Sequence, residues 1–422
     1  MNFAHKFKLV FKDKNLRNRI FFVLASLIVF RALASIPIPG VDIARLNEFF
    51  SNSQFLGLLN MFSGGGLSSL SIVMLGVSPY ITASIIMQLM TMMIPKLKEM
   101  YHEEGEAGKK KFSQYSRLLT IPLALIQGFG FLRLLQSQGA VDILGNFELF
   151  TNIMVITAGS VLLMWIGELI SEYGIGNGVS LLIFAGIVSG LPTSLSQLYF
   201  SFEMSQLPML LGFLIVSIAI VYAIVVVTEA ERPIPINYAK RVRGSKVYGG
   251  VSTYLPLRVN QAGVIPIIFA MSILLFPQMI LNFLVNSSNE IVKNVSDFML
   301  GIMSNSWVYA VMYFLLVFFF TYFYTAITFD PDAISQNLQK SGAFIPGVRP
   351  GEKTSEYLGK VLTRITLVGA IFLGIIAVLP LILQAFTGIA ALAIGGTALL
   401  IVVSVVLDLV KKIDAQVSMR EY

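Results

Sequence analysis

Ten stretches of this chain are apolar and long enough, at about 20 residues each, to cross the hydrocarbon core of a bilayer as helices. Hydrophobic residues make up 56% of the 422 residues and charged residues only 13%, which is far from the composition of a soluble domain. We therefore predict an all-α polytopic membrane protein. The predicted spans lie near residues 20–38, 75–94, 117–136, 150–171, 176–192, 207–228, 258–284, 305–328, 361–383 and 388–410.

Basic residues collect on one side of these spans. Of the 30 lysines and arginines, all but Arg31, Arg45, Arg133 and Lys293 fall in the N-terminus, the C-terminus and every second connecting loop. Under the positive-inside rule these segments are cytoplasmic, and an even number of spans agrees with two cytoplasmic ends. Ten spans also divide into two halves of five, and an odd number gives the halves opposite topology, as in inverted-repeat membrane proteins.

Two cytoplasmic loops carry turn signals that predict folded structure. In residues 229–257, the β-prone pieces 234–238 and 246–248 flank Arg243-Gly244-Ser245, which suggests a hairpin. In residues 330–360, Asp330-Pro331 reads as an N-cap and a first helical residue, with a helix running to about Lys340. Two proline-glycine turns then flank Arg349. We interpret both loops as parts of a docking surface.

The region around the second predicted span has an unusual pattern. Residues 61–73 are rich in glycine and serine, so they are flexible and only weakly hydrophobic. In the span that follows, helical periodicity puts five residues on one stripe that is aliphatic at one end and polar at the other. This pattern favours a helix lining a pore with a dry waist and a wet vestibule. The stripe consists of Val77, Ile81, Ser84, Gln88 and Thr91.

Several motifs, in the same order along the chain, resemble the SecY family. Residues 71–89 carry the most specific one, and further matches run from about residue 20 to residue 408. The additional motifs are Ile36-Pro37-Ile38-Pro39-Gly40, Asn60-Met61-Phe62-Ser63-Gly64-Gly65, Gly174-Ile175-Gly176-Asn177-Gly178, Tyr238-Ala239-Lys240-Arg241, Ala262-Gly263-Val264-Ile265-Pro266, the stretch 340–351 and Gly395-Gly396-Thr397.

The resemblance implies ten transmembrane helices in two inverted five-helix halves around a central hourglass pore, with a short plug helix. It also implies a ring of aliphatic side chains at the waist of the pore. Within two pairs of these residues the spacing is four, so each pair stacks on one helical face, and each pair follows a glycine, Gly76 or Gly178. The ring residues are Val77, Ile81, Val179, Ile183, Ile268 and Ile401. Because two of them are valines where isoleucine is usual, we expect the closed seal to depend more on the plug.

The resemblance also assigns the plug and a lateral gate. The gate is a seam between the second and seventh spans, with Gln88 and Asn260 as polar partners. A re-entrant or interfacial loop is an alternative interpretation of the plug segment, and polar residues such as Gln88 commonly hold helices together. The plug occupies 61–73, with Phe62, Ser63, Gly64, Gly65, Gly66, Leu67, Ser68, Ser69 and Leu70 as its candidate residues.

By the same resemblance, cations of the two folded loops dock a ribosome or the motor ATPase SecA. Clustered cations suit RNA phosphates and acidic protein surfaces equally, so the sequence does not separate these partners. The other implied partners are the small membrane subunits SecE and SecG, signal-bearing substrate polypeptides and membrane lipids, in the inner (cytoplasmic) membrane of a cell. The docking candidates are Lys240, Arg241, Arg243 and Arg349.

The resulting division of the chain is a cytoplasmic N-terminus, a first half, two cytoplasmic loops that separate the later spans, and a cytoplasmic tail. The expected function is a channel that passes unfolded secretory polypeptides and releases hydrophobic segments sideways into lipid. The segments are 1–19, 20–228 with spans one to six, the loop 229–257, spans seven and eight in 258–329, the loop 330–360, spans nine and ten in 361–410, and the tail 411–422.

A secondary transporter and an enzyme are the alternatives to a channel. A secondary transporter usually holds an ionisable residue near mid-depth, but the charges nearest the spans here, such as Glu168 and Asp408, fall toward helix ends. An enzyme is not expected: the chain has no cysteine, its two histidines lie in cytoplasmic segments, and it has no phosphate-binding GxxxxGK[ST] motif. We therefore expect no catalytic residues, no cofactor and no metal site.

Overall fold

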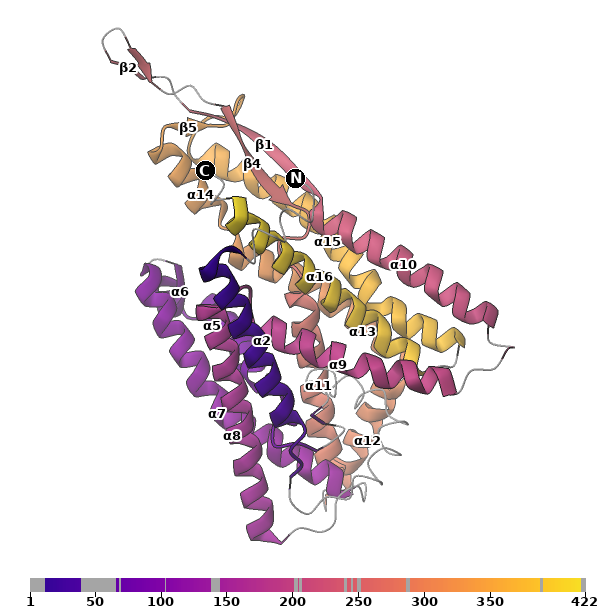
Figure 1. Cartoon of the computed structure of the whole chain (residues 1–422). Coiled ribbons are helices and arrows are strands. Elements are labelled where there is room, and N and C mark those ends of the chain that lie inside the picture. Colours follow the sequence, from indigo (N-terminus) through magenta and orange to yellow (C-terminus); the bar gives the residue numbers. More distant parts are fainter. Residues whose placement is uncertain are drawn as a thin grey trace.

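The computed structural model shows a bundle of long helices with a small β-sheet at one end (Figure 1). The ten predicted spans each correspond to one helix, which confirms the predicted fold class. The structure describes residues 12–38, 66–67, 70–102, 104–137, 145–200, 204, 207–238, 241–243, 246–248, 252–285, 289–387 and 390–418. The ten helices are α2 (Lys14–Ala34), α5 (Ser78–Met93), α7 (Gly105–Ser137), α8 (Asn146–Tyr173), α9 (Gly178–Phe200), α10 (Leu207–Glu229), α11 (Ile265–Leu284), α13 (Ser306–Thr328), α15 (Glu352–Thr387) and α16 (Ala390–Ser418).

Not all of these helices are long apolar rods. By length and composition alone, four helices of the described chain could cross a membrane. A fifth candidate is α5 together with α6 (Pro95–His102), and the two are bent by 114° where proline follows the end of α5. The apolar parts of α9, α10 and α11 are shorter. Because their apolar parts are short, these helices depend on packing against neighbouring helices for their position in the bundle.

The helices form two groups that meet in the middle of the molecule (Figure 1). In the first group α7 packs against α5 and α8, and α2 packs against α8. In the second, α13 packs against α11 and α15, and α16 packs against α15 and α10. The groups are joined where α11 contacts α5 and α7, and where α9 contacts α16. By these contacts α10, the sixth span, lies with the second group.

Two helices begin three or more residues after the start of the spans predicted for them. The second span was expected from residue 75, but α5 starts at Ser78 because Gly76 takes a left-handed conformation, with φ of +59°. The seventh was expected from residue 258, but α11 starts at Ile265. The residues before it belong to a strand that ends at Arg258 and to a turn at Gly263 with φ of +61°.

The described parts of the loops 229–257 and 330–360 fold into one platform at the end of the bundle (Figure 1). Strand β1 (Glu231–Tyr238) lies between β4 (Ser252–Arg258) and β5 (Ala343–Phe344), antiparallel to both. Ile234 pairs with Leu255, and their side chains join a core that includes the first turns of α15. The predicted helix at 330–340 is confirmed as α14 (Pro331–Lys340).

The predicted hairpin is present, but its first strand was wrong. β3 (Lys246–Tyr248) pairs with β2 (Arg241–Arg243), and not with 234–238. The segment 234–238 belongs to β1, whose ladder with β4 joins seven residue pairs, against three pairs between β2 and β3. The short β2–β3 hairpin therefore projects beyond the longer one (Figure 1).

Candidate functional site

The six aliphatic positions expected to form a ring lie in one hydrophobic cluster at the centre of the bundle. Five of them are buried, with exposed fractions between 1% for Ile183 and 7% for Ile81, and Val179 is partly buried against the same cluster. Val77 is the N-cap of α5, and the other five lie in α5, α9, α11 and α16, so both groups of helices contribute. The cluster also contains residues of outer helices, such as Phe30 and Val317. Membership alone therefore does not single out the six.

Close backbone contact fixes the start of α9, which carries two of the six. A Cβ atom on Gly178 would collide with the carbonyl oxygen of Gly167 in α8. The backbone N–H of Gly178 donates to the Ser171 hydroxyl at 2.8 Å. The change of chain direction itself occurs at Gly176, with φ of +95°. Glycine at 178 is thus required for approach to α8, which sets where Val179 sits.

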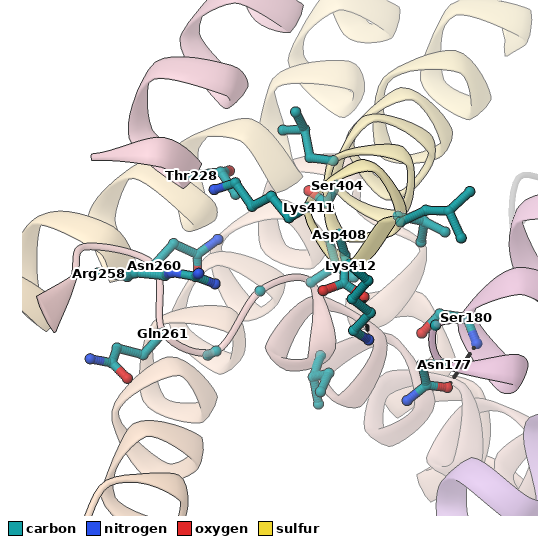
Figure 2. Close-up of a pocket in the computed structure, with 18 of the residues that line it drawn as sticks. Asn177, Ser180, Thr228, Arg258, Asn260, Gln261, Ser404, Asp408, Lys411 and Lys412 are labelled. Carbon is teal, nitrogen blue, oxygen red and sulfur yellow. Dashed lines mark hydrogen bonds and ion pairs between the residues drawn. The ribbon is translucent and has the colours of Figure 1, made fainter. Parts of the chain in front are cut away.

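A pocket lined by both polar and apolar side chains lies next to this cluster, between the ends of α9, α10, α11 and α16 (Figure 2). Its volume is about 270 Å³. On three helices the pocket residues lie one helical turn from an expected ring residue: Ser180 precedes Ile183, Val264 precedes Ile268, and Val405 follows Ile401. On all three helices the pocket residue lies on the platform side of the ring residue. The pocket therefore lies directly above the aliphatic positions, toward the platform.

The charges around the pocket neutralise one another. Lys412 pairs with Asp408 at 2.7 Å, as the dashed line in Figure 2 shows. Arg258 pairs with Glu231 at 3.2 Å, and the ammonium of Lys411 lies 3.8 Å from the carboxylate of Glu229. What remains for a ligand is hydrogen-bonding capacity from Asn177, Ser180, Asn260 and Gln261. No group of three or more potential metal-binding side chains occurs among the described residues.

The two amides expected at the lateral seam occupy different surroundings. Asn260 precedes α11 and lines the pocket, where its side chain is 6% exposed (Figure 2). Gln88 lies in α5. The side-chain oxygens of both are buried without a hydrogen-bond partner in the described part of the chain, so neither oxygen accepts a hydrogen bond from the other amide. The helices themselves do pack, since α5 contacts α11.

Part of the expected plug segment is described, and it packs on α7 and α8. Leu67 and Leu70 are fully buried in a second cluster with Phe131 and Ile156. The segment is also tied to the end of α2: Ile38 N–H donates to the Leu70 carbonyl at 2.8 Å. The described residues of this segment are in turns, except Ser71, which forms an isolated antiparallel bridge with Pro37, so the predicted plug helix is not seen among them. Phe62, Ser63, Gly64, Gly65, Ser68 and Ser69 lie outside the described residues.

A face of small residues on α8 contacts this segment. This contact was not predicted from the sequence. A Cβ atom on Gly159 would collide with the carbonyl oxygen of Ile72. Beside it, the hydroxyls of Ser71, Thr157 and Ser160 are buried and have no hydrogen-bond partner in the described structure. The run Thr157-Ala158-Gly159-Ser160 could have indicated this contact, because small residues in a membrane helix mark places where another backbone comes close.

Three of the four expected docking residues, Arg241, Arg243 and Arg349, lie on the platform, at the end of the molecule that carries the sheet. Arg349 is exposed between Gly347 and Gly351, whose φ values of +81° and +97° confirm the two predicted turns. The Arg349 carbonyl accepts a hydrogen bond from the Thr354 hydroxyl at 3.0 Å, which holds the loop on α15. Arg241 and Arg243 belong to β2, and Lys240 lies outside the described residues.

Two lysines of α15, which begins just after this loop, form ion pairs with one glutamate. Glu356 accepts hydrogen bonds from Lys360 at 2.7 Å and from Lys353 at 2.9 Å. These two partners lower the pKa of the Glu356 carboxyl to about 2. Lys340, at the end of α14, is exposed. Near Arg349, the lysines of α15 are therefore already paired.

Comparison with known proteins decides the family. A family model described as SecY matches residues 71–410. The chain belongs to the SecY family. A "Protein translocase subunit SecY" from Corynebacterium glutamicum is 44% identical over 98% of this chain and 97% of its own length. The protein of the same description from Thermotoga maritima is 43% identical over 99% of this chain and 96% of its own length. The family consists of translocase channel subunits, in agreement with the expectation that the chain is not an enzyme.

Solved structures share the fold at lower sequence identity. "The structure of a protein conducting channel" matches 96% of this chain and 93% of its own, with a TM-score of 0.66 at 18% identity. "Sec61 in the Canine ribosome-channel complex from the endoplasmic reticulum" covers the same shares, with a TM-score of 0.62 at 18% identity. The multi-pass membrane fold predicted from the sequence thus agrees with that of SecY-type channels.

Proposed function

We propose that this chain is the protein-conducting channel of a Sec translocon, which passes unfolded secretory polypeptides across a cytoplasmic membrane. The observation that carries the proposal is that a pocket with amide and hydroxyl groups, whose charged residues are paired, lies directly beside the aliphatic positions of α9, α11 and α16. Amide and hydroxyl groups in the pocket can exchange hydrogen bonds with any polypeptide backbone. The aliphatic positions form no directional bonds, so they accept any side chain.

In this proposal the six aliphatic residues form the pore ring and the segment 61–73 forms the plug. An aliphatic constriction resists water and ions by dewetting. The plug reinforces the seal from the α7–α8 side, where Leu67 and Leu70 are buried. Movement of α11 away from α5 would open the seam to lipid, so that hydrophobic segments leave sideways. Gln88 and Asn260 are the polar residues of that seam.

The platform is the proposed docking surface for the cytoplasmic partner, with Lys240, Arg241, Arg243 and Arg349 as its contacts. Support comes from the exposure of Arg349 on a loop held by two glycine turns, beside lysines of α15 that are already paired with Glu356. The partner is a translating ribosome or the motor SecA, because the sequence contains no nucleotide-binding motif of its own. SecE and SecG are the proposed membrane subunits, and both termini are proposed to be cytoplasmic.

Site-specific crosslinking from the pore ring tests this function. A signal-bearing substrate is arrested halfway through the reconstituted channel, with a photoreactive amino acid at position 81 or 401. The matched control is position 406, on the same helix as 401 but with a side chain 39% exposed. We expect substrate crosslinks from 81 and 401 and lipid crosslinks from 406. Lipid crosslinks alone from all three positions would refute the channel and favour a transporter.

A further inference from the structure

Helix α12 (Glu290–Ser304) was not among the predicted spans, and it has three distinct faces. At roughly 100° per residue, its side chains divide into three sectors of similar width. One sector packs on the protein, where α12 contacts α11 and α13. The second is exposed and polar, and the third is exposed and apolar. The packed sector contains Val292, Ser296, Leu300 and Met303, and the polar sector contains Glu290, Lys293, Asn294 and Asp297.

The apolar sector is continuous and large. Ile291 is 74% exposed and Phe298 is 70% exposed. Five such residues recur at helical spacing over the whole length of α12, whereas scattered single apolar residues are normal on any surface. Two faces would suffice for a helix between protein and water. A third, apolar face requires a third environment. The sector consists of Ile291, Val295, Phe298, Met299 and Ile302.

The neighbouring helix shows what this environment is. Asn305 ends α12 and is the N-cap of α13, and its side chain accepts a hydrogen bond from the N–H of Trp307 at 3.0 Å. Trp307 is 58% exposed and opens a stripe of exposed apolar residues that continues along α13 through Val311, Leu315 and Phe319. Tryptophan at the end of a membrane span is typical of the boundary between headgroups and acyl chains. The C-terminal end of α12, joined to α13 through Asn305, therefore lies close to this boundary.

We propose that α12 lies in the membrane interface on the side away from the platform, with its apolar sector among lipid acyl chains and its polar sector in water. Figure 1 shows α12 at the end of the molecule opposite the sheet. The occupant of the apolar sector is the bilayer itself. The polar sector carries two acids and one lysine, so attraction to anionic headgroups is not needed and zwitterionic lipid suffices. The proposal rests on the multi-pass membrane fold and not on the channel function.

The sequence allows a direct test, because the chain contains no cysteine and three consecutive residues of α12 face the three environments. Single-cysteine variants Ser296→Cys, Asp297→Cys and Phe298→Cys are spin-labelled in the full chain and reconstituted in phosphatidylcholine vesicles. Collisions with oxygen, which concentrates in lipid, are compared with collisions with a water-soluble nickel chelate. Ile302→Cys repeats the apolar sector one turn later.

We expect the label at 298, and likewise at 302, to collide strongly with oxygen and several-fold less with the nickel chelate than the label at 297. The buried position 296 should be protected from both reagents. Equal access of the chelate to 297 and 298 would place the apolar sector in water and overturn the proposal. Protection of 298 from both reagents would also overturn it, because the sector would then be covered by protein, such as a second copy of the chain. Unchanged elution of each variant as a single species in detergent excludes unfolding as the cause.

Discussion

The membrane core and the platform are built by different kinds of interaction. In the core, side chains such as Ile183 and Ile268 are surrounded by other aliphatic groups, and no directional bond fixes their positions. In the platform, strand register, helix caps and ion pairs fix the backbone around a small core of its own. The core is therefore suited to part and reseal, whereas the platform is suited to hold one shape against a partner.

The two regions also use glycine differently. In the membrane, Gly159 and Gly178 are required because another backbone comes too close for a Cβ atom. In the platform, Gly342 and Gly347 have positive φ values and open space around them, so they serve the turn alone. Substitution should thus disturb packing in the first region and loop conformation in the second.

The largest effect is expected when a directional group enters the core. Replacing Ile183 by asparagine puts an amide into a buried aliphatic site, where water is recruited to satisfy it. We expect the resting ion leak in planar bilayers to rise on the order of tenfold. Ile183→Leu, which adds no polar group, is the control. An asparagine variant that leaks no more than this control would show that the core does not depend on its apolar character.

A slightly smaller effect is expected where the plug segment meets α8. Gly159→Ala places a methyl group against the Ile72 carbonyl, so the segment 70–77 must shift from its place. We expect a leak several-fold above that of the unaltered chain, since typical overpacking costs about 1–3 kcal/mol.

Gly212 in α10 provides the matched control for this substitution, because nothing lies within 4 Å of the place that an added Cβ atom would take. Gly212→Ala should leave the leak unchanged. Equal leaks from the two alanine variants would show that the contact with α8 does not hold the plug segment.

In the platform, reversal of an exposed charge should affect partner binding and leave the seal intact. Arg349→Glu should reduce partner-driven translocation into reconstituted vesicles about tenfold or more, as expected for a central interface arginine. Lys353→Glu is the control, because Lys353 lies nearby on α15 but already pairs with Glu356. Transport by Arg349→Glu at the rate of this control would remove Arg349 from the docking surface.

The smallest effect is expected from a helix cap of the platform. Asp330 accepts hydrogen bonds from the N–H groups of Asp332 at 2.9 Å and Ala333 at 3.2 Å. Asp330→Ala should destabilise α14 by about 1 kcal/mol. Hydrogen exchange of the α14 amides should then be roughly fivefold faster, with no change in α13. Asp330→Asn keeps an acceptor and should exchange nearly as the unaltered chain does. Equal acceleration in both variants would contradict the cap.

The predictable parts of the molecule were those whose signal is local. The span at 305–328 corresponds to α13 within a residue, because the apolar run follows the side-chain cap Asn305 and is succeeded by Asp330, which caps the next helix. The helix after Asp330 follows from one side chain and one proline. By contrast, the partner of the strand 234–238 depends on a segment that lies beyond an intervening hairpin, and local propensity does not identify it.

The candidate site likewise contains features with a local sequence signal and features that depend on contacts between distant segments. Gly76 and the platform turns were identifiable from residue type, but the contact of Gly159 with Ile72 joins segments far apart in the chain. The three faces of α12 were equally hidden, since an apolar residue on a short helix looks the same whether it meets protein or lipid.

Local sequence signals were sufficient to predict that the chain spans a membrane many times and where its capped helices begin. These properties depend on transfer of apolar residues into lipid and on short-range hydrogen bonds. Tertiary packing was needed to show which aliphatic residues converge beside the pocket and which lie on outer helices. The reason is physical: lipid and protein interior are both apolar, so a membrane helix carries little record of which side faces its neighbours.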